Sequence, residues 1–248
     1  MVYLDNCNKK IWIGYKNFKD LAYVVRSGFG YYGIYPINPD ELKPKKGRKP
    51  LPESDLEHVA GMIHLARLIS WYYPEIIPKE KLDDYLFGAT IHEMGELLTG
   101  DTMDDGERNE QHKDFLETLE IRTYLRQCAP TEEYSRGLKI YEEMRDKKTD
   151  FGKTLYFIDK LEACLQAIYY EAMGAPGRIS KKEYFYGSIS NRDKREREYT
   201  GSDKIADTWS HLFARKAEKL EFKFINEFLE ILETAIQDVR GVSFSWID

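Results

Sequence analysis

The sequence predicts an all-α protein, and three observations lead to this prediction. Apolar residues recur at steps of three and four along most of the chain, which is the period of an amphipathic helix and differs from the alternation of strands. Proline and glycine fall between the periodic segments, where helices end. The chain has 248 residues, of which 42% are hydrophobic, so it is long enough for one large or two small cores.

The first periodic segment is Ser54–Tyr73, where Val59, Ala66 and other apolar residues share one side and Pro74 follows. The second is Lys79–Thr99. Gly100 ends it. The remaining predicted helices are Glu107–Gln127, Glu132–Lys147, Phe151–Met173 and a long final helix, Asp203–Val239.

The final helix carries a wide apolar stripe that includes Phe213, Phe224 and Phe228. Such a stripe must be buried, either on the rest of this chain or on a second copy, so a homodimer is one expectation. We predict a helical core over residues 1–175. Residues 176–248 form a C-terminal helical extension that packs on this core, as a separate part or within the same single domain.

Two segments are predicted loops. Leu42–Pro52 combines prolines with a run of Lys and Arg, and Asn191–Gly201 is dense in charged residues without apolar anchors. A solvated loop is the simpler interpretation of both. For the basic run of Leu42–Pro52, a positive rim that attracts a phosphorylated substrate is the alternative.

Charge and composition exclude several classes of function. A net charge of −6 repels polyanions, so we expect no nucleic-acid partner. No stretch approaches the roughly 18 consecutive apolar residues of a membrane span, so we expect no membrane association. Asp5, Lys9 and Lys10 stand where a signal peptide would be apolar, and we therefore expect a cytoplasmic protein.

The three cysteines do not form a recognisable redox or zinc motif. Cys7, Cys128 and Cys164 are odd in number, far apart and outside any CxxC spacing. We expect them to be reduced packing residues.

Polar residues that can bind a metal interrupt otherwise apolar helices at three places. Charged groups among core residues are costly to bury unless they are paired or bind a metal. A single helical histidine such as His58 is more often a packing residue, and it is the combination that carries a prediction. His58, His92, Glu93 and Asp159 together supply two imidazoles and two carboxylates. This set suits one divalent ion such as Mn, Co, Fe, Ni or Zn, with positions left open for substrate.

Two further acidic residues follow His92. Glu96 is four residues later, which on an α-helix is the same face, so its carboxylate could orient or deprotonate a water outside the ligand set. Asp101 comes just after the helix stop at Gly100. It either contacts substrate or organises the turn.

The order of three motifs adds a family resemblance. Residues 53–58 read Glu-Ser-Asp-Leu-Glu-His, residues 92–101 read His-Glu-x-x-Glu-x-x-x-Gly-Asp, and residues 158–163 read Ile-Asp-Lys-Leu-Glu-Ala. Together they resemble the HD-domain metal-dependent phosphohydrolases, in particular the bacterial 5′-deoxynucleotidase-like branch. The resemblance extends over about residues 15–175.

The resemblance implies a compact helical domain that holds one divalent metal through His58, His92, the acidic residue after it and Asp159. It also implies that Glu96 assists the attacking water. An arginine matched by Arg26 would bind the substrate phosphate, a role for which the planar guanidinium is suited.

The sequence departs from the family pattern at two positions. Glu93 stands where the family has the aspartate of its name, and its extra methylene requires a moved metal, a tilted helix or a different binding mode. Ser27 stands where the nucleotidase branch has a tryptophan near the sugar, so a preference for deoxyribose is not carried over.

The resemblance therefore predicts a divalent-metal-dependent phosphomonoesterase that acts on nucleoside 5′-monophosphates or a similar small phosphorylated metabolite. One alternative is hydrolysis of a nucleoside triphosphate, a cyclic nucleotide or an alarmone at the same site. The other is a non-catalytic module that binds a metal or a nucleotide.

Overall fold

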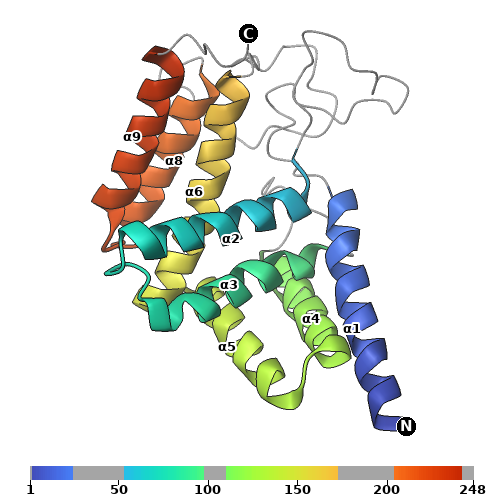
Figure 1. Ribbon diagram of the computed structural model, residues 1–248. Helices are drawn as coiled ribbons and strands as arrows, with labels where there is room; N and C mark the ends of the chain where they lie inside the picture. The colour runs from blue at the N-terminus through green and yellow to red at the C-terminus, as the bar shows by residue number, and fades with distance from the viewer. Residues whose placement is uncertain (1, 25–52, 98–109, 173–203, 242–248) are drawn as a thin grey trace, which may run out of the picture. The chain divides into compact units, whose positions relative to one another are not determined.

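The structure confirms an all-α protein. It is a computed structural model that describes residues 2–24, 53–97, 110–172 and 204–241, which form α-helices, short 3₁₀ helices and turns (Figure 1). The α-helices are α1 (Val2–Asp20), α2 (Asp55–Tyr72), α3 (Leu82–Ile91), α4 (Glu110–Cys128), α5 (Thr131–Asp146), α6 (Asp150–Ala172), α8 (Ile205–Lys219) and α9 (Ile225–Gly241). The 3₁₀ helices are η1 (Leu21–Tyr23), η4 (Lys79–Lys81) and η5 (His92–Glu96).

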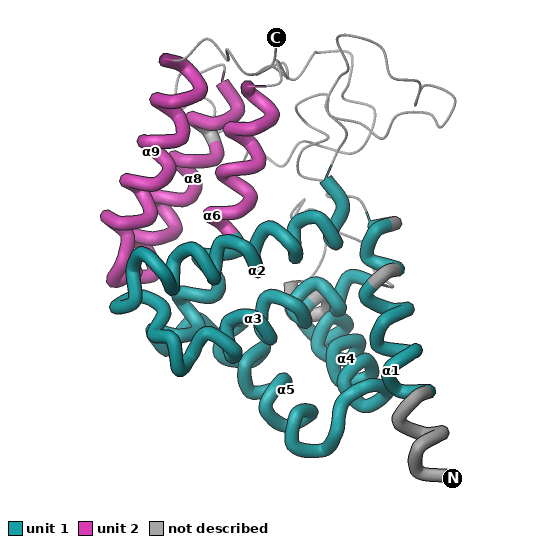
Figure 2. Tube along the Cα trace, viewed as in Figure 1, with its two compact units in different colours: residues 1–25, 53–102, 107–159 teal, residues 26–52, 103–106, 160–248 magenta. Residues whose placement is uncertain are grey.

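The chain divides into two compact units (Figure 2). Unit 1 comprises residues 1–25, 53–102 and 107–159, and unit 2 comprises residues 26–52, 103–106 and 160–248. Helix α6 contributes its residues up to Asp159 to unit 1 and its later residues to unit 2. The predicted division between residues 1–175 and 176–248 stays a prediction.

Unit 1 is built around a core of side chains from η1, α2, α3, η5, α4 and α5. Removal of these apolar surfaces from water is the main contribution to its stability. The buried members of this cluster are Leu21, Val59, Ile91, Met94, Ile121, Leu125 and Tyr141. Ile91 and Met94 come immediately before and after His92 and Glu93. The segment that carries these two predicted ligands is therefore anchored in the core at both ends.

Helix α2 begins with a capping box. The Ser54 side chain accepts a hydrogen bond from the Glu57 backbone N–H, and the Glu57 carboxylate accepts one from the Ser54 backbone N–H at 2.8 Å. These bonds satisfy two of the N–H groups that a helix start leaves without a partner. The observed bounds agree with the predicted helix Ser54–Tyr73 to within one residue at each end.

Helix α1 was not among the predicted helices. It packs against α4, where a Cβ placed on Gly14 would lie 3.1 Å from the Cys128 Cβ, and Lys10 Nζ donates to the Ala129 carbonyl at 3.4 Å. Its large side chains Ile11, Trp12 and Tyr15 are mostly exposed. Phe18 of the same helix packs against the core of unit 1. Apolar residues of α1 do recur at helical spacing, at Ile11, Tyr15 and Phe18, so the sequence carried a signal that the prediction missed.

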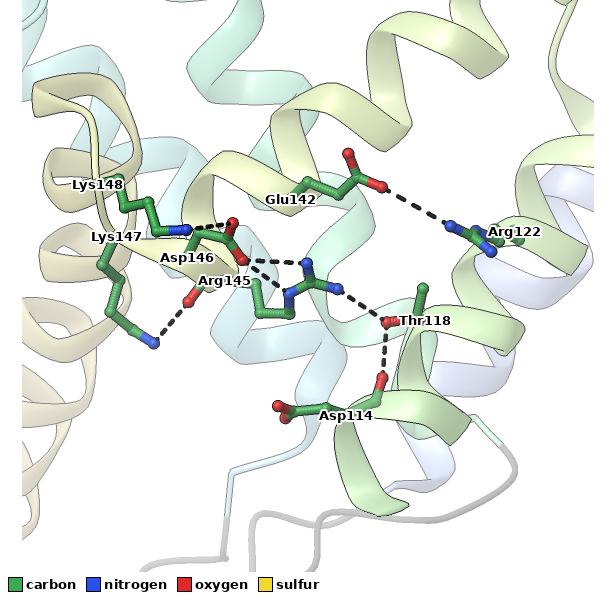
Figure 3. A network of polar contacts seen from close by, with 8 residues as sticks. All are labelled: Asp114, Thr118, Arg122, Glu142, Arg145, Asp146, Lys147 and Lys148. Atoms are coloured by element: carbon green, nitrogen blue, oxygen red, sulfur yellow. Dashed lines mark hydrogen bonds and ion pairs between the residues drawn. The ribbon is translucent and has the colours of Figure 1, made fainter. Parts of the chain in front are cut away.

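A network of polar contacts joins the end of α5 to α4 (Figure 3). Arg145 donates to Asp146 through Nε and Nη2, at 3.1 and 3.0 Å, and its Nη1 donates to the Thr118 hydroxyl of α4 at 3.4 Å. Arg122 of α4 lies 3.7 Å from Glu142 of α5. These contacts are largely exposed, so they orient the helices more than they stabilise the fold.

The predicted long helix Asp203–Val239 is wrong in one respect, because it is two helices, α8 and α9. Glu221 adopts a left-handed backbone conformation, with φ at 49°. The N–H of Phe222 donates to Ala217 O at 2.9 Å, and the N–H of Glu221 donates to Glu218 O at 3.0 Å. This pair of bonds is the Schellman motif that ends helices.

The predicted aromatic stripe of this region is buried within unit 2. The rings of Phe213 and Phe228 stack at 6.2 Å between centroids, and Phe222 packs edge-on against Phe228 at 5.1 Å. Arg240 of α9 donates to Glu171 of α6 at 2.8 Å and to Asp207 of α8 at 2.7 Å. The stripe therefore joins α8 to α9, and the turn between them is what permits this packing.

Of the helices that the structure describes, none combines the length and the apolar character needed to cross a lipid bilayer.

Candidate metal centre

The four predicted metal ligands lie together in unit 1. His58 comes from α2, His92 and Glu93 come from η5, and Asp159 comes from α6. Each offers one ligand atom, and these atoms all lie within 4.8 Å of one another. Residues far apart in the sequence thus meet at one point, as the predicted metal site requires.

Distances within the group are those of direct polar contact. His58 Nε2 lies 3.2 Å from Asp159 Oδ1 and 3.4 Å from Glu93 Oε1, and His92 Nε2 lies 3.0 Å from the same Glu93 oxygen. The two imidazole rings are 5.5 Å apart between centroids. His58 is fully buried, and Glu93 and Asp159 are 4% and 5% exposed.

Each histidine is tied to a backbone carbonyl of the preceding turn. The N–H of His58 donates to the carbonyl of Ser54 at 3.0 Å, in the first turn of α2 that the capping box fixes. His92 Nδ1 lies 3.0 Å from the Ala89 carbonyl oxygen. Because a carbonyl only accepts hydrogen bonds, this contact places the proton on Nδ1 and the lone pair on Nε2.

The chemistry of the group fits a cation. Among the described residues, no hydrogen-bond partner exists for the buried His92 Nε2, although its lone pair faces the cluster. Glu93 and Asp159 bring two buried carboxylates to the same place. Buried carboxylates are stable when a positive charge balances them, and a divalent ion supplies that charge while accepting the imidazole lone pairs.

Glu96 does not share a helical face with His92, so that part of the prediction is wrong. The predicted helix Lys79–Thr99 changes from α to 3₁₀ geometry at His92, and η5 extends to Glu96. In a 3₁₀ helix, residues three apart eclipse each other. Glu96 therefore aligns with Glu93.

A second group of carboxylates follows from this alignment. Asp55, Glu93 and Glu96 have ligand atoms within 4.8 Å of one another, and Glu93 belongs to both groups. Asp55 is fully buried and was not predicted as a site residue. Its spacing was the available signal, because Asp55 precedes His58 by three residues in α2 and so lies on the same face.

Other predicted residues lie outside the part of the chain that the structure describes. These are Arg26, Asp101, and the predicted loops Leu42–Pro52 and Asn191–Gly201.

The helical fold and its buried group of two histidines and two carboxylates are typical of a helical metal-binding domain. A model of the HD domain matches residues 44–201, which is more than half of the sequence. The chain therefore belongs to the HD domain family. The match begins later and ends later than the region predicted from the motifs. No curated protein matches the chain.

Three solved structures share this fold. The PH0347 protein from Pyrococcus horikoshii OT3 is 17% identical, with a TM-score of 0.56 over 92% of this chain and 97% of that chain. A conserved hypothetical protein from Pyrococcus furiosus is 20% identical, with a TM-score of 0.52 over 92% and 98%. A predicted metal-dependent phosphohydrolase from Magnetospirillum magnetotacticum MS-1 is 14% identical, with a TM-score of 0.50 over 89% and 97%. At these identities the likeness concerns the fold alone.

Proposed function

We propose that this HD-domain protein is a metal-dependent phosphohydrolase. The finer proposal is a phosphomonoesterase on nucleoside 5′-monophosphates or a similar small phosphorylated metabolite. The observation that carries the proposal is the buried group of His58, His92, Glu93 and Asp159, whose ligand atoms lie within 4.8 Å of one another. The membership of the HD domain family supports the same class, and the Magnetospirillum magnetotacticum protein of the same fold is named as a predicted metal-dependent phosphohydrolase.

The four residues would hold one divalent ion. Two imidazole nitrogens and two carboxylate oxygens suit Mn, Co, Fe, Ni or Zn. When bound, such an ion polarises a phosphate oxygen and lowers the pKa of water toward neutrality. His58 and Asp159 approach from α2 and α6, so the ligand set also joins two helices.

The other predicted residues would act on the water and the phosphate. Glu96 is 9% exposed and lies beside Glu93. From there its carboxylate would orient the attacking water and accept its proton. Arg26 would bind the phosphate oxygens and offset the charge that develops on them. Asp101 would contact the substrate. The water oxygen would bond to phosphorus as the bond from phosphorus to the ester oxygen breaks. The ester oxygen would take up the proton that Glu96 accepted, which yields orthophosphate and an alcohol.

Phosphate release tests this proposal. The wild-type protein is assayed on a panel of ribo- and deoxyribonucleoside 5′-monophosphates with added Mn, Co or Mg. We expect His92→Ala and Asp159→Ala to lose both bound metal and turnover, because each removes a ligand. His64→Ala is the matched control, since His64 is an exposed histidine on α2 and should keep both. If His92→Ala or Asp159→Ala keeps full metal content and rate, the proposal is wrong.

Glu93 gives the binding-module alternative its specific support, because the family has aspartate at this position. Restoring the shorter side chain with Glu93→Asp separates the two functions. A weakened enzyme gains rate in this variant, whereas a module that only binds a metal or nucleotide stays inactive. If metal binds but no monophosphate is cleaved, the products from triphosphates, cyclic nucleotides and alarmones decide among the remaining substrates.

A further inference from the structure

We propose that Gly88 is a positioning residue for the metal centre: its missing side chain lets α3 pack on Leu155 of α6, and this contact sets the spacing between His92 and Asp159. The inference rests on the proposed function, because it concerns the same ligands. Gly88 is not one of the four ligand residues, and its effect would pass through the helices that carry them.

A series of contacts between α3 and α6 leads toward the ligands. The rings of Tyr85 and Phe151 lie 4.6 Å apart between centroids, and Gly88 faces Leu155 further along both helices. His92 and Asp159 come four residues after Gly88 and Leu155 respectively, which is about one helical turn in each case. A shift of the two helices at the contact between Gly88 and Leu155 would therefore act close to both ligands.

Gly88 is also bonded directly to the segment that presents His92. The backbone N–H of His92 donates to the Gly88 carbonyl, and the His92 ring contacts the carbonyl of Ala89 at 3.0 Å. A displacement of Gly88 and Ala89 would therefore move both the backbone and the ring of His92.

There is no space for a side chain at Gly88. A Cβ built there overlaps the Cδ2 atom of Leu155 and lies 3.0 Å from Cγ2 of Ile140. Leu155 is fully buried, so its side chain cannot turn into solvent. Because interiors are close-packed, an added methyl group must shift Leu155 or separate the two helices.

Metal sites are sensitive to such shifts. Ligand distances in metal sites are constrained to about 0.2 Å. Changes in the residues that orient the ligands typically weaken metal affinity by about 10–100-fold. We therefore expect Gly88→Ala to weaken binding of Mn or Co by about 10-fold or more.

A double-mutant cycle with Leu155→Val tests the inference. Valine lacks the δ carbons that the added methyl group would overlap, so Gly88→Ala with Leu155→Val should recover wild-type affinity. The readouts are Co affinity in solution and the visible absorption spectrum of bound Co, which reports ligand geometry. Gly14→Ala is the matched control. It fills a helix contact with Cys128 on α4, which carries none of the four ligands, so affinity and spectrum should not change.

The outcomes separate this inference from the proposed function. If the wild type binds no metal, or His92→Ala binds as tightly as the wild type, the proposed centre fails. If His92→Ala loses binding while Gly88→Ala keeps wild-type affinity and spectrum, only the role of Gly88 is overturned. Weakened binding that Leu155→Val does not restore overturns it as well.

The same cycle remains informative if Gly88→Ala alone does not fold. The double variant then decides. Wild-type affinity and spectrum in the folded double variant support the inference, and weakened binding or failure to fold contradicts it.

Discussion

His92 uses its two ring nitrogens for different purposes. Nδ1 contacts the Ala89 carbonyl within its own chain segment at 3.0 Å, while Nε2 lies 3.0 Å from Glu93 Oε1 in the cluster. The first contact fixes the tautomer and the ring orientation before any ligand arrives. A histidine prepared in this way loses little conformational freedom when it binds a cation.

Cys128 gives a prediction at the same scale. Burial raises the pKa of its thiol above the ordinary value, and its Sγ donates to the Tyr124 carbonyl at 3.1 Å. The folded state therefore favours the protonated thiol. Because the unfolded thiol ionises near pH 8.5, the stability contributed by this group is complete below about that pH and falls as pH rises further.

Alkylation followed by peptide mass spectrometry measures this effect. At neutral pH we expect Cys128 to react more slowly in the folded protein than in the urea-unfolded protein, because the thiolate is the reactive form. The rate in the folded protein should rise as the solution is made alkaline. Equal rates in both states at neutral pH would contradict the shift.

The meeting of the four predicted ligand residues was predictable from their polar chemistry within apolar helices and, above all, from the order of the three motifs that resembles the HD-domain family. His58, His92, Glu93 and Asp159 interrupt apolar segments, and the structure brings all four together. The relation of Glu96 to His92 was not predictable, because it depends on the change to 3₁₀ geometry at His92. Gly95 weakens an α-helix at this place, but a single glycine does not distinguish a 3₁₀ helix from an α-helix.

At the scale of elements, helix ends with strong signals were predictable. The Ser54 cap and Pro74 mark the ends of α2 to within a residue. The turn between α8 and α9 was not, since the left-handed position is filled by Glu221, whereas glycine is the residue that normally marks such a helix end. The Schellman hydrogen bonds and the packing of the phenylalanines stabilise this turn, and both are visible only in the folded structure.

The turn predicts opposite effects for one substitution at two positions. A left-handed conformation costs a non-glycine residue roughly 1–2 kcal/mol. Glycine avoids this cost but has greater conformational freedom in the unfolded chain, which offsets part of the stabilisation. Glu221→Gly should therefore raise the free energy of unfolding by about 1 kcal/mol. Glu230→Gly, at an exposed position within α9, should lower it by about 1 kcal/mol. Urea unfolding measures both, and a loss of stability in Glu221→Gly would contradict the assignment.

At the scale of the whole molecule, the fold class was predictable from periodicity alone. The division of α6 between the two compact units was not predictable, because nothing in the sequence of a continuous helix marks a boundary within it. Leu155 and Leu161 belong to one continuous periodic pattern, although they lie in different units.

Metal binding should stabilise the folded protein by an amount that grows with the logarithm of the free ion concentration divided by its Kd. A ligand that binds only the folded state, at a free concentration 100 times its Kd, raises the free energy of unfolding by about 2.7 kcal/mol. We expect added Mn or Co to raise the thermal midpoint of the chelator-treated protein. His92→Ala is the comparison, and the same rise in this variant would mean that the ion binds elsewhere.

The separation of the ligands along the chain has a consequence for synthesis. His58, His92 and Glu93 emerge from the ribosome well before Asp159, the last member of the group. A nascent chain that ends before α6 therefore lacks one of the four ligands and the helix that carries it. The complete centre can be filled only after α6 has emerged, so a bound ion would mark a chain whose first compact unit is finished.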